Sequence, residues 1–181
     1  MAVRAGSGYL VAVADGAGGT GNGAAAAERL IAALTKLATG AASTDWFGAL
    51  CAIDDELSAS GGQTTGIVAF VDRDRIIGAS VGDSEAWLIS PDGKVTDLTA
   101  RQRRRPLLGS GEALPVQFDA ELGDARLLVA SDGLFKYATV EQICAIAIQG
   151  SVVEAANVLV NSVRLPSGAL QDDVGVVMVA A

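Results

Sequence analysis

Four turns that carry aspartate adjoin short apolar runs, and these aspartates are the residues whose chemistry the sequence suggests most directly. A single Asp-Gly pair is most simply a turn, because aspartate accepts hydrogen bonds from nearby backbone. Several carboxylates gathered at neighbouring strand ends, however, repel one another unless a cation neutralises them. We therefore expect the four turns to converge on one metal site. Their aspartates are Asp15 after residues 11–14, Asp83 after 76–81, Asp132 after 127–130, and Asp172 with Asp173 before 174–179.

The absence of histidine limits the chemistry available to such a site. It excludes serine or cysteine nucleophiles that histidine activates, and it excludes histidine-ligated zinc. Ligand sets made only of oxygen select hard cations, which favours Mg²⁺ or Mn²⁺. Two such ions bridged by a carboxylate would lower the pKa of a shared water and so supply a hydroxide nucleophile. They would also hold a phosphoryl oxygen as it gains charge.

The composition excludes several classes of partner and location. A net charge of -8 argues against nucleic acid, since phosphate backbones are held by lysine and arginine. No apolar run approaches the roughly 18 residues of a membrane span, and no targeting segment is evident at the N-terminus. We therefore expect no membrane partner and a cytoplasmic protein. Cys51 and Cys144 lack metal-binding spacing and are expected to be buried thiols in a reducing compartment.

The elements that must position these aspartates follow from the periodicity of apolar residues. Strands are predicted at residues 8–14, 64–71, 75–81, 86–90, 94–98, 116–122, 125–130 and 174–179. Helices are predicted at residues 23–38, 44–57 (capped by Thr44), 139–148 (capped by Thr139) and 151–163. Hairpin-type turns join most strands, and the helices fall in two blocks. This pattern predicts an α+β fold of two antiparallel sheets flanked by helices, with residues 1–181 forming a single domain.

The glycine-rich turn after the first predicted strand allows an alternative interpretation. Residues 16–21 satisfy the spacing G-x-G-x-x-G between a strand and a helix, which is typical of dinucleotide-binding domains. Such a unit continues into a second strand, yet residues 41–57 have a helical pattern. Asp15 would also place a carboxylate beside the pyrophosphate, where the two charges repel. The dinucleotide-binding hypothesis is therefore the weaker one.

Five short motifs follow one another in an order that resembles a known family. They are Val13-Ala14-Asp15-Gly16-Ala17-Gly18-Gly19, Gly62-Gln63-Thr64-Thr65, Val81-Gly82-Asp83-Ser84, the segment 127–134, and Asp172-Asp173-Val174. Their order and wording resemble the metal-dependent protein phosphatases of type 2C, which remove phosphate from serine and threonine. The resemblance runs through nearly the whole chain. It implies a short bacterial-type member with a four-layer α/β/β/α sandwich, acting on phosphorylated protein substrates that a cognate kinase supplies.

The resemblance also implies roles for individual residues. Asp15 would bridge two Mg²⁺ or Mn²⁺ ions, and Gly16 would offer its carbonyl oxygen to one of them. Asp132 and Asp172 would complete the site of the other ion. Asp83 would match a ligand of a third, weaker metal. By this resemblance Asp15, Asp132 and Asp172 are the candidate catalytic residues.

The chain departs from the family pattern at several positions. Only 14 residues precede Asp15, so the chain is expected to lack the family's usual N-terminal strand. That part of the family carries an arginine that grips the substrate phosphate, followed by an acidic pair. Ala17 replaces a histidine found in many members, and Glu85 stands where arginine is usual. Lys136 stands where an aspartate often binds the third metal, and Gly175 replaces a threonine.

A run of arginines at residues 101–105 interrupts the otherwise acidic chain, where the family usually carries a longer flap. The simpler interpretation is a solvated loop that offsets acidic surface. The alternative is that Arg103 and Arg104 bind the substrate phosphate in place of the missing arginine. The departures also support an alternative function, that of a catalytically weak or inactive domain that binds a phosphoprotein or a regulatory partner.

Overall fold

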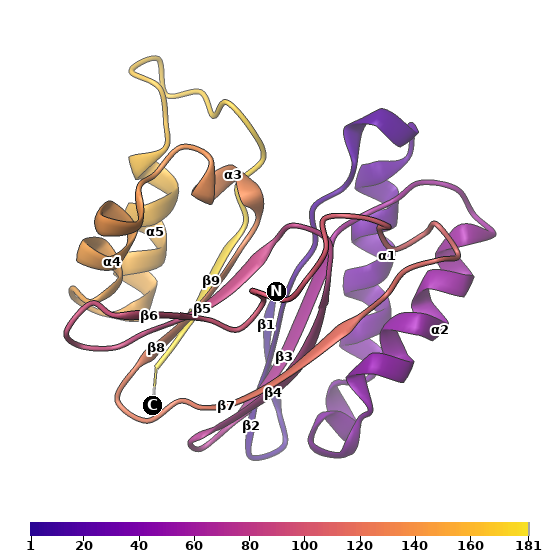
Figure 1. Cartoon of the computed structure of the whole chain (residues 1–181), viewed down its shortest axis with the longest axis horizontal. Coiled ribbons are helices and arrows are strands. Elements are labelled where there is room, and N and C mark those ends of the chain that lie inside the picture. Colours follow the sequence, from indigo (N-terminus) through magenta and orange to yellow (C-terminus); the bar gives the residue numbers. More distant parts are fainter. Residues whose placement is uncertain (181) are drawn as a thin grey trace.

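Two antiparallel sheets pack face to face, and helices cover their outer faces (Figure 1). The computed structural model describes residues 1–180, without the side chain of Thr20. The larger sheet has five strands in the order β1 (Ala2–Ala5), β2 (Gly8–Val13), β3 (Gly66–Asp72), β4 (Arg75–Val81) and β7 (Val116–Glu121). The smaller sheet has four, in the order β6 (Val95–Asp97), β5 (Glu85–Ile89), β8 (Arg126–Ala130) and β9 (Val176–Val179).

The helices form the two outer layers. Helices α1 (Gly23–Lys36) and α2 (Trp46–Ser58) lie against the larger sheet, and α4 (Val140–Ala147) and α5 (Val152–Ser162) lie against the smaller one (Figure 1). The short helix α3 (Asp132–Phe135) follows β8 directly, and two 3₁₀ helices, η1 (Gly18–Thr20) and η2 (Ala38–Ser43), flank α1. The predicted α+β fold of four layers is confirmed. Among the helices of the described chain, none is long and apolar enough to cross a membrane.

The central strands are buried on both faces, which explains why they read as continuous apolar runs. Side chains alternate between the two faces of a strand. Ala12 and its register partner Val68 therefore pack in the layer that contains Leu30 of α1. Val11 packs with Ile67 between the two sheets. Because β2 and β3 are fixed on both sides, the turn that follows β2 is held in a defined position.

Three local features differ from the sequence prediction. The first strand is β1 rather than β2, because the short edge strand Ala2–Ala5 has no apolar run long enough to be recognised. Helix α3 was not predicted, because a single turn is too short to show helical periodicity. Helix α2 is capped by Asp45, which accepts a hydrogen bond from the Phe47 amide at 3.1 Å. Thr44, the predicted cap, instead donates its hydroxyl to the Gly40 carbonyl at 2.9 Å.

A buried carboxylate on α2 anchors the loop that follows the arginine run. Asp54 is 3% exposed and accepts hydrogen bonds from the backbone amides of Gly109 at 2.6 Å, Gly111 at 3.2 Å and Ala113 at 2.9 Å. Because buried polar groups are costly unless they are paired, these three bonds fix the loop against α2. The arginine run therefore leads into an immobilised segment.

Candidate active site

The structure brings the predicted aspartates together at one open cavity of about 510 Å³. Asp15 lies two residues beyond β2, and Asp132 is the first residue of α3 after β8. Asp83 lies in the turn between β4 and β5, and Asp172 lies in the segment before β9. All four line the cavity. Two strands of each sheet thus deliver a carboxylate to the same place.

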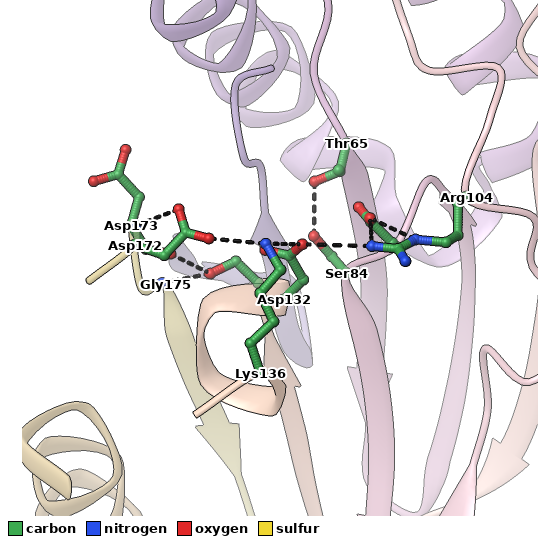
Figure 2. A network of polar contacts seen from close by, with 10 residues as sticks. Thr65, Ser84, Arg104, Asp132, Lys136, Asp172, Asp173 and Gly175 are labelled. Carbon is green, nitrogen blue, oxygen red and sulfur yellow. Dashed lines mark hydrogen bonds and ion pairs between the residues drawn. The ribbon is translucent and has the colours of Figure 1, made fainter. Parts of the chain in front are cut away.

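The ammonium group of Lys136 lies between two of these carboxylates (Figure 2). Its Nζ is 2.7 Å from Oδ2 of Asp132 and 2.8 Å from Oδ2 of Asp172. Hydrogen bonds to Asp132 and to Asp172 raise the pKa of Lys136, so this side chain stays charged. The same contact lowers the pKa of Asp172. Lys136 therefore neutralises part of the acidic cluster from inside the cavity.

Arg104, which belongs to the arginine run, is the second cationic side chain at the cavity after Lys136. Its Nε and Nη2 atoms donate to Oδ2 of Asp83 at 3.0 and 2.8 Å, and Nη2 lies 4.0 Å from Oδ2 of Asp132 (Figure 2). Arg105 also lines the cavity. Arg103, which the sequence singled out with Arg104, is exposed and does not line it. The structure thus places Arg104 and Arg105, rather than Arg103, beside the aspartates.

Asp15 is left as the least neutralised member of the cluster. Burial and the negative charges of Asp132, Asp172, Asp173 and Asp83 raise its pKa to about 6. Among the described residues, no lysine or arginine forms an ion pair with it. A half-buried carboxylate surrounded by like charges is held at a cost that a bound cation would remove.

Buried hydroxyl groups hold the backbone on which Asp15 stands. The Asp15 amide donates to Oγ1 of Thr65 at 3.1 Å, and its carbonyl accepts from the Thr65 amide at 2.8 Å and from Oγ1 of Thr64 at 3.0 Å. Oγ1 of Thr65 also lies 2.7 Å from Oγ of Ser84 (Figure 2). No role for Ser84 or for the two threonines was predicted from the sequence. Their positions inside the recognised motifs were the available signal.

A second hydroxyl joins the turn after β8 to the segment before β9. Oγ of Ser131 donates to the Asp173 carbonyl at 3.1 Å and accepts from the Gly175 amide at 2.9 Å (Figure 2). The glycine that follows Asp132 makes this approach possible, because a Cβ at Gly133 would lie 2.3 Å from the Asp173 carbonyl oxygen. The Asp-Gly pair therefore brings Asp132 close to Asp172 rather than simply forming a turn.

The donor groups at this cavity fit a divalent cation in their chemistry. Three carboxylates, Asp15, Asp132 and Asp172, together with the Gly16 backbone form a set of oxygen donors that suits Mg²⁺ or Mn²⁺. Burial and the neighbouring carboxylates raise the pKa of Asp15, and a cation bound beside it would offset both effects. In this structure, however, the side chains of these residues are not arranged as a coordination shell. Within residues 1–180 no group of three or more acidic, thiol or imidazole side chains has metal-binding geometry.

Comparisons with known proteins place this fold in a defined structural class. No protein-family model matches the sequence, and no curated protein matches it significantly. A bacterial serine phosphatase has a similar structure with a TM-score of 0.86 at 19% identity, covering 99% of this chain and 89% of its own. Serine/threonine phosphatase Stp1 from Staphylococcus aureus gives 0.85 at 19% identity, covering 100% and 87%. The catalytic domain of the serine/threonine protein phosphatase PstP, in complex with 2 manganese ions, gives 0.77 at 26% identity, covering 93% and 86%.

The chain has the fold of the bacterial serine/threonine phosphatases. The resemblance that its five motifs indicated is thereby confirmed. The dinucleotide-binding alternative is wrong. The glycine-rich turn at 16–21 follows a strand of a fully antiparallel sheet, whereas a dinucleotide-binding domain needs a parallel strand-helix-strand unit.

Proposed function

We propose that this chain hydrolyses phosphoserine and phosphothreonine in proteins, using Mg²⁺ or Mn²⁺ held by Asp15, Gly16, Asp132 and Asp172. The observation that carries the proposal is the convergence of three aspartates from both sheets on one cavity, with the pKa of Asp15 raised to about 6. The shared fold supports it, as does the presence of manganese in the PstP complex. A phosphorylated protein is then the substrate, and a kinase supplies it.

The residues of the chain have separable tasks in this proposal. A bound divalent cation supplies a more acidic water and neutralises charge on the phosphoryl oxygens. Hydrogen bonds to Thr65 hold the backbone of Asp15, so the residue that carries this carboxylate has a defined position before a substrate arrives. Arg104 and Arg105 offer guanidinium groups at the cavity to the phosphoryl oxygens. The aspartates themselves repel a phosphate dianion, so substrate binding depends on cations.

We expect two ions, for which Asp15 would be a shared ligand, and no third ion at Asp83. Arg104 donates two hydrogen bonds to Asp83, the residue assigned to that third ion, and Lys136 stands at its other expected ligand position. A neighbouring cavity of about 400 Å³ shares Asp83, Asp132, Arg104 and Lys136 with the first and extends to Glu85. Because the two cavities share four lining residues, we propose that the second one receives residues that flank a phosphorylated side chain.

Metal removal gives the direct test of this function. We expect the purified chain to release phosphate from a phosphothreonine peptide and from an aryl phosphate when Mn²⁺ is present. The rate should fall to background with EDTA and recover when Mn²⁺ is added again, because the acidic cavity cannot hold a phosphate dianion without cations. Phosphate release is measured at increasing Mn²⁺ concentrations. Absence of turnover at saturating Mn²⁺ would contradict the proposal.

A second candidate function follows from the ion pairs that Lys136 and Arg104 form in the cavity. Lys136 and Arg104 already neutralise Asp132, Asp172 and Asp83, which favours a domain that binds a phosphoprotein without hydrolysing it. This candidate predicts that a fluorescent phosphothreonine peptide binds while its phosphate remains attached. Anisotropy and phosphate release, measured on one sample with the unphosphorylated peptide as control, separate the two functions.

A further inference from the structure

The ammonium group of Lys136 lies where a cation shared by Asp132 and Asp172 would lie. It donates to Oδ2 of each residue, at 2.7 and 2.8 Å (Figure 2). These are the two carboxylates that the proposed function assigns to the same divalent ion. An ammonium group and a metal ion that use the same oxygen atoms exclude each other. Lys136 and the metal therefore compete for one position.

The fold directs Lys136 to this position. Lys136 is the capping residue directly after α3, four residues after Asp132, and its amide donates to the Asp132 carbonyl at 2.9 Å. Gly133 lets the same turn approach the backbone of Asp173, which brings Asp172 within reach of the lysine. One short helix therefore carries a proposed metal ligand and the ammonium that blocks it.

The lysine can leave this position without disturbing the core. Its side chain is 43% exposed, whereas that of Asp132 is 16% exposed. The Lys136 side chain can therefore turn its ammonium group into solvent while the carboxylate of Asp132 stays in place. Ion pairs with this much exposure contribute little to stability, so a divalent cation that breaks them loses only a small amount of binding free energy.

We propose that Lys136 is a tethered competitor of the divalent cation, which must displace its ammonium from Asp132 and Asp172 in order to bind. The inference rests on the proposed function for the assignment of that cation site. Its consequence is a site that fills only at higher metal concentrations than the same carboxylates would otherwise need. The chain would then remain without metal at low concentrations of Mn²⁺ and respond as the concentration rises.

Binding of Mn²⁺ alone tests the inference without reference to activity. Lys136→Met removes the charge while keeping the length and apolar stem of the side chain. We expect this variant to bind Mn²⁺ about 10-fold more tightly than the unmodified chain in isothermal titration calorimetry, a difference equivalent to about 1.4 kcal/mol. Lys94→Met is the matched control, because Lys94 is exposed and the change in net charge is identical. It should leave the affinity unchanged.

A charge-preserving variant distinguishes competition from a general change in the cavity. Lys136→Arg keeps a cation on the same turn, so its affinity for Mn²⁺ should stay near that of the unmodified chain. Equal or weaker Mn²⁺ binding by Lys136→Met would overturn the inference, and so would a gain in affinity of the same size in Lys94→Met. Absence of Mn²⁺ binding in every variant would overturn it as well.

The two proposals fail in different ways. Tighter Mn²⁺ binding by Lys136→Met, with no phosphate release by any variant, would support the competition and contradict the phosphatase function. Metal-dependent phosphate release by the unmodified chain, with equal affinities for Mn²⁺ in all variants, would support the function and overturn the competition.

Discussion

Replacing Asp132 with asparagine is expected to reduce Mn²⁺-dependent phosphate release by at least about 10²-fold, the loss typical of removing one group that stabilises transition-state charge. Asp132 lies within reach of both cations of the cavity, since its Oδ2 is 2.7 Å from Lys136 Nζ and 4.0 Å from Arg104 Nη2. It also contributes the strongest of the charges that raise the pKa of Asp15. The neutral amide keeps the shape but loses the charge that holds a cation. The measurement is kcat/KM for a phosphothreonine peptide at saturating Mn²⁺.

Asp124→Asn is the matched control for this variant. Asp124 is exposed in the turn between β7 and β8, and its replacement changes the net charge by the same amount. Its activity should equal that of the unmodified chain. Thermal unfolding of both variants shows whether each is folded in the assay. Full activity in a folded Asp132→Asn variant would remove Asp132 from the site.

Replacing Asp15 with asparagine is expected to stabilise the metal-free protein at pH 7. The folded-state pKa of Asp15 is raised from 3.8 to about 6 by burial and by the neighbouring carboxylates. The stability associated with this group is therefore fully present below about pH 4 and is lost as the pH rises to about 6. Full burial would make the cost about 3 kcal/mol, and solvent screening of a half-buried group reduces it to about 1–2 kcal/mol. An increase in Tm of about 2–6 °C should follow.

The pH dependence of this gain identifies its cause. Thermal unfolding of Asp15→Asn and the unmodified chain in EDTA should differ at pH 7 and converge well below pH 3.8, where Asp15 is protonated in both the folded and the unfolded state. Asp124→Asn should show no such difference. A stability gain that is equal at both pH values would mean that packing accounts for it, and not the burial of the Asp15 charge and its repulsion by the neighbouring carboxylates. A destabilised variant at pH 7 would contradict the electrostatic description of the cavity.

The layers of the fold could be predicted from the sequence because each strand and helix is indicated by residues within its own segment. The buried runs around β2, β3 and β8 have the apolar character that double-sided burial requires, and Ser151 and Thr139 show complete capping boxes. Strand β1 and helix α3 could not be predicted in this way. Strand β1 is a short edge strand that pairs with the adjacent β2, and α3 is a single turn, so neither is long enough to show a periodic pattern of its own.

The carboxylates of the site could be proposed from their places beside strands, but its electrostatics could not. Lys136 appeared in the sequence only as a departure from a motif. Its role depends on how closely α3 approaches Asp172, which the contact between Gly133 and the Asp173 backbone sets. The same holds for Arg104, which the fold, and not its sequence spacing, brings to Asp83. Charge partners across such distances become visible only in three dimensions.

The central claim, that Asp15, Asp132 and Asp172 form a cation site, is tested most directly by locating the metal. Crystals of the chain soaked in Mn²⁺ would show its position in an anomalous difference map. We predict a peak within coordination distance of carboxylate oxygens from all three aspartates, with the ammonium of Lys136 moved away from Asp132 and Asp172. An absence of any peak at saturating Mn²⁺, or peaks only outside the cavity that these aspartates line, would contradict this account.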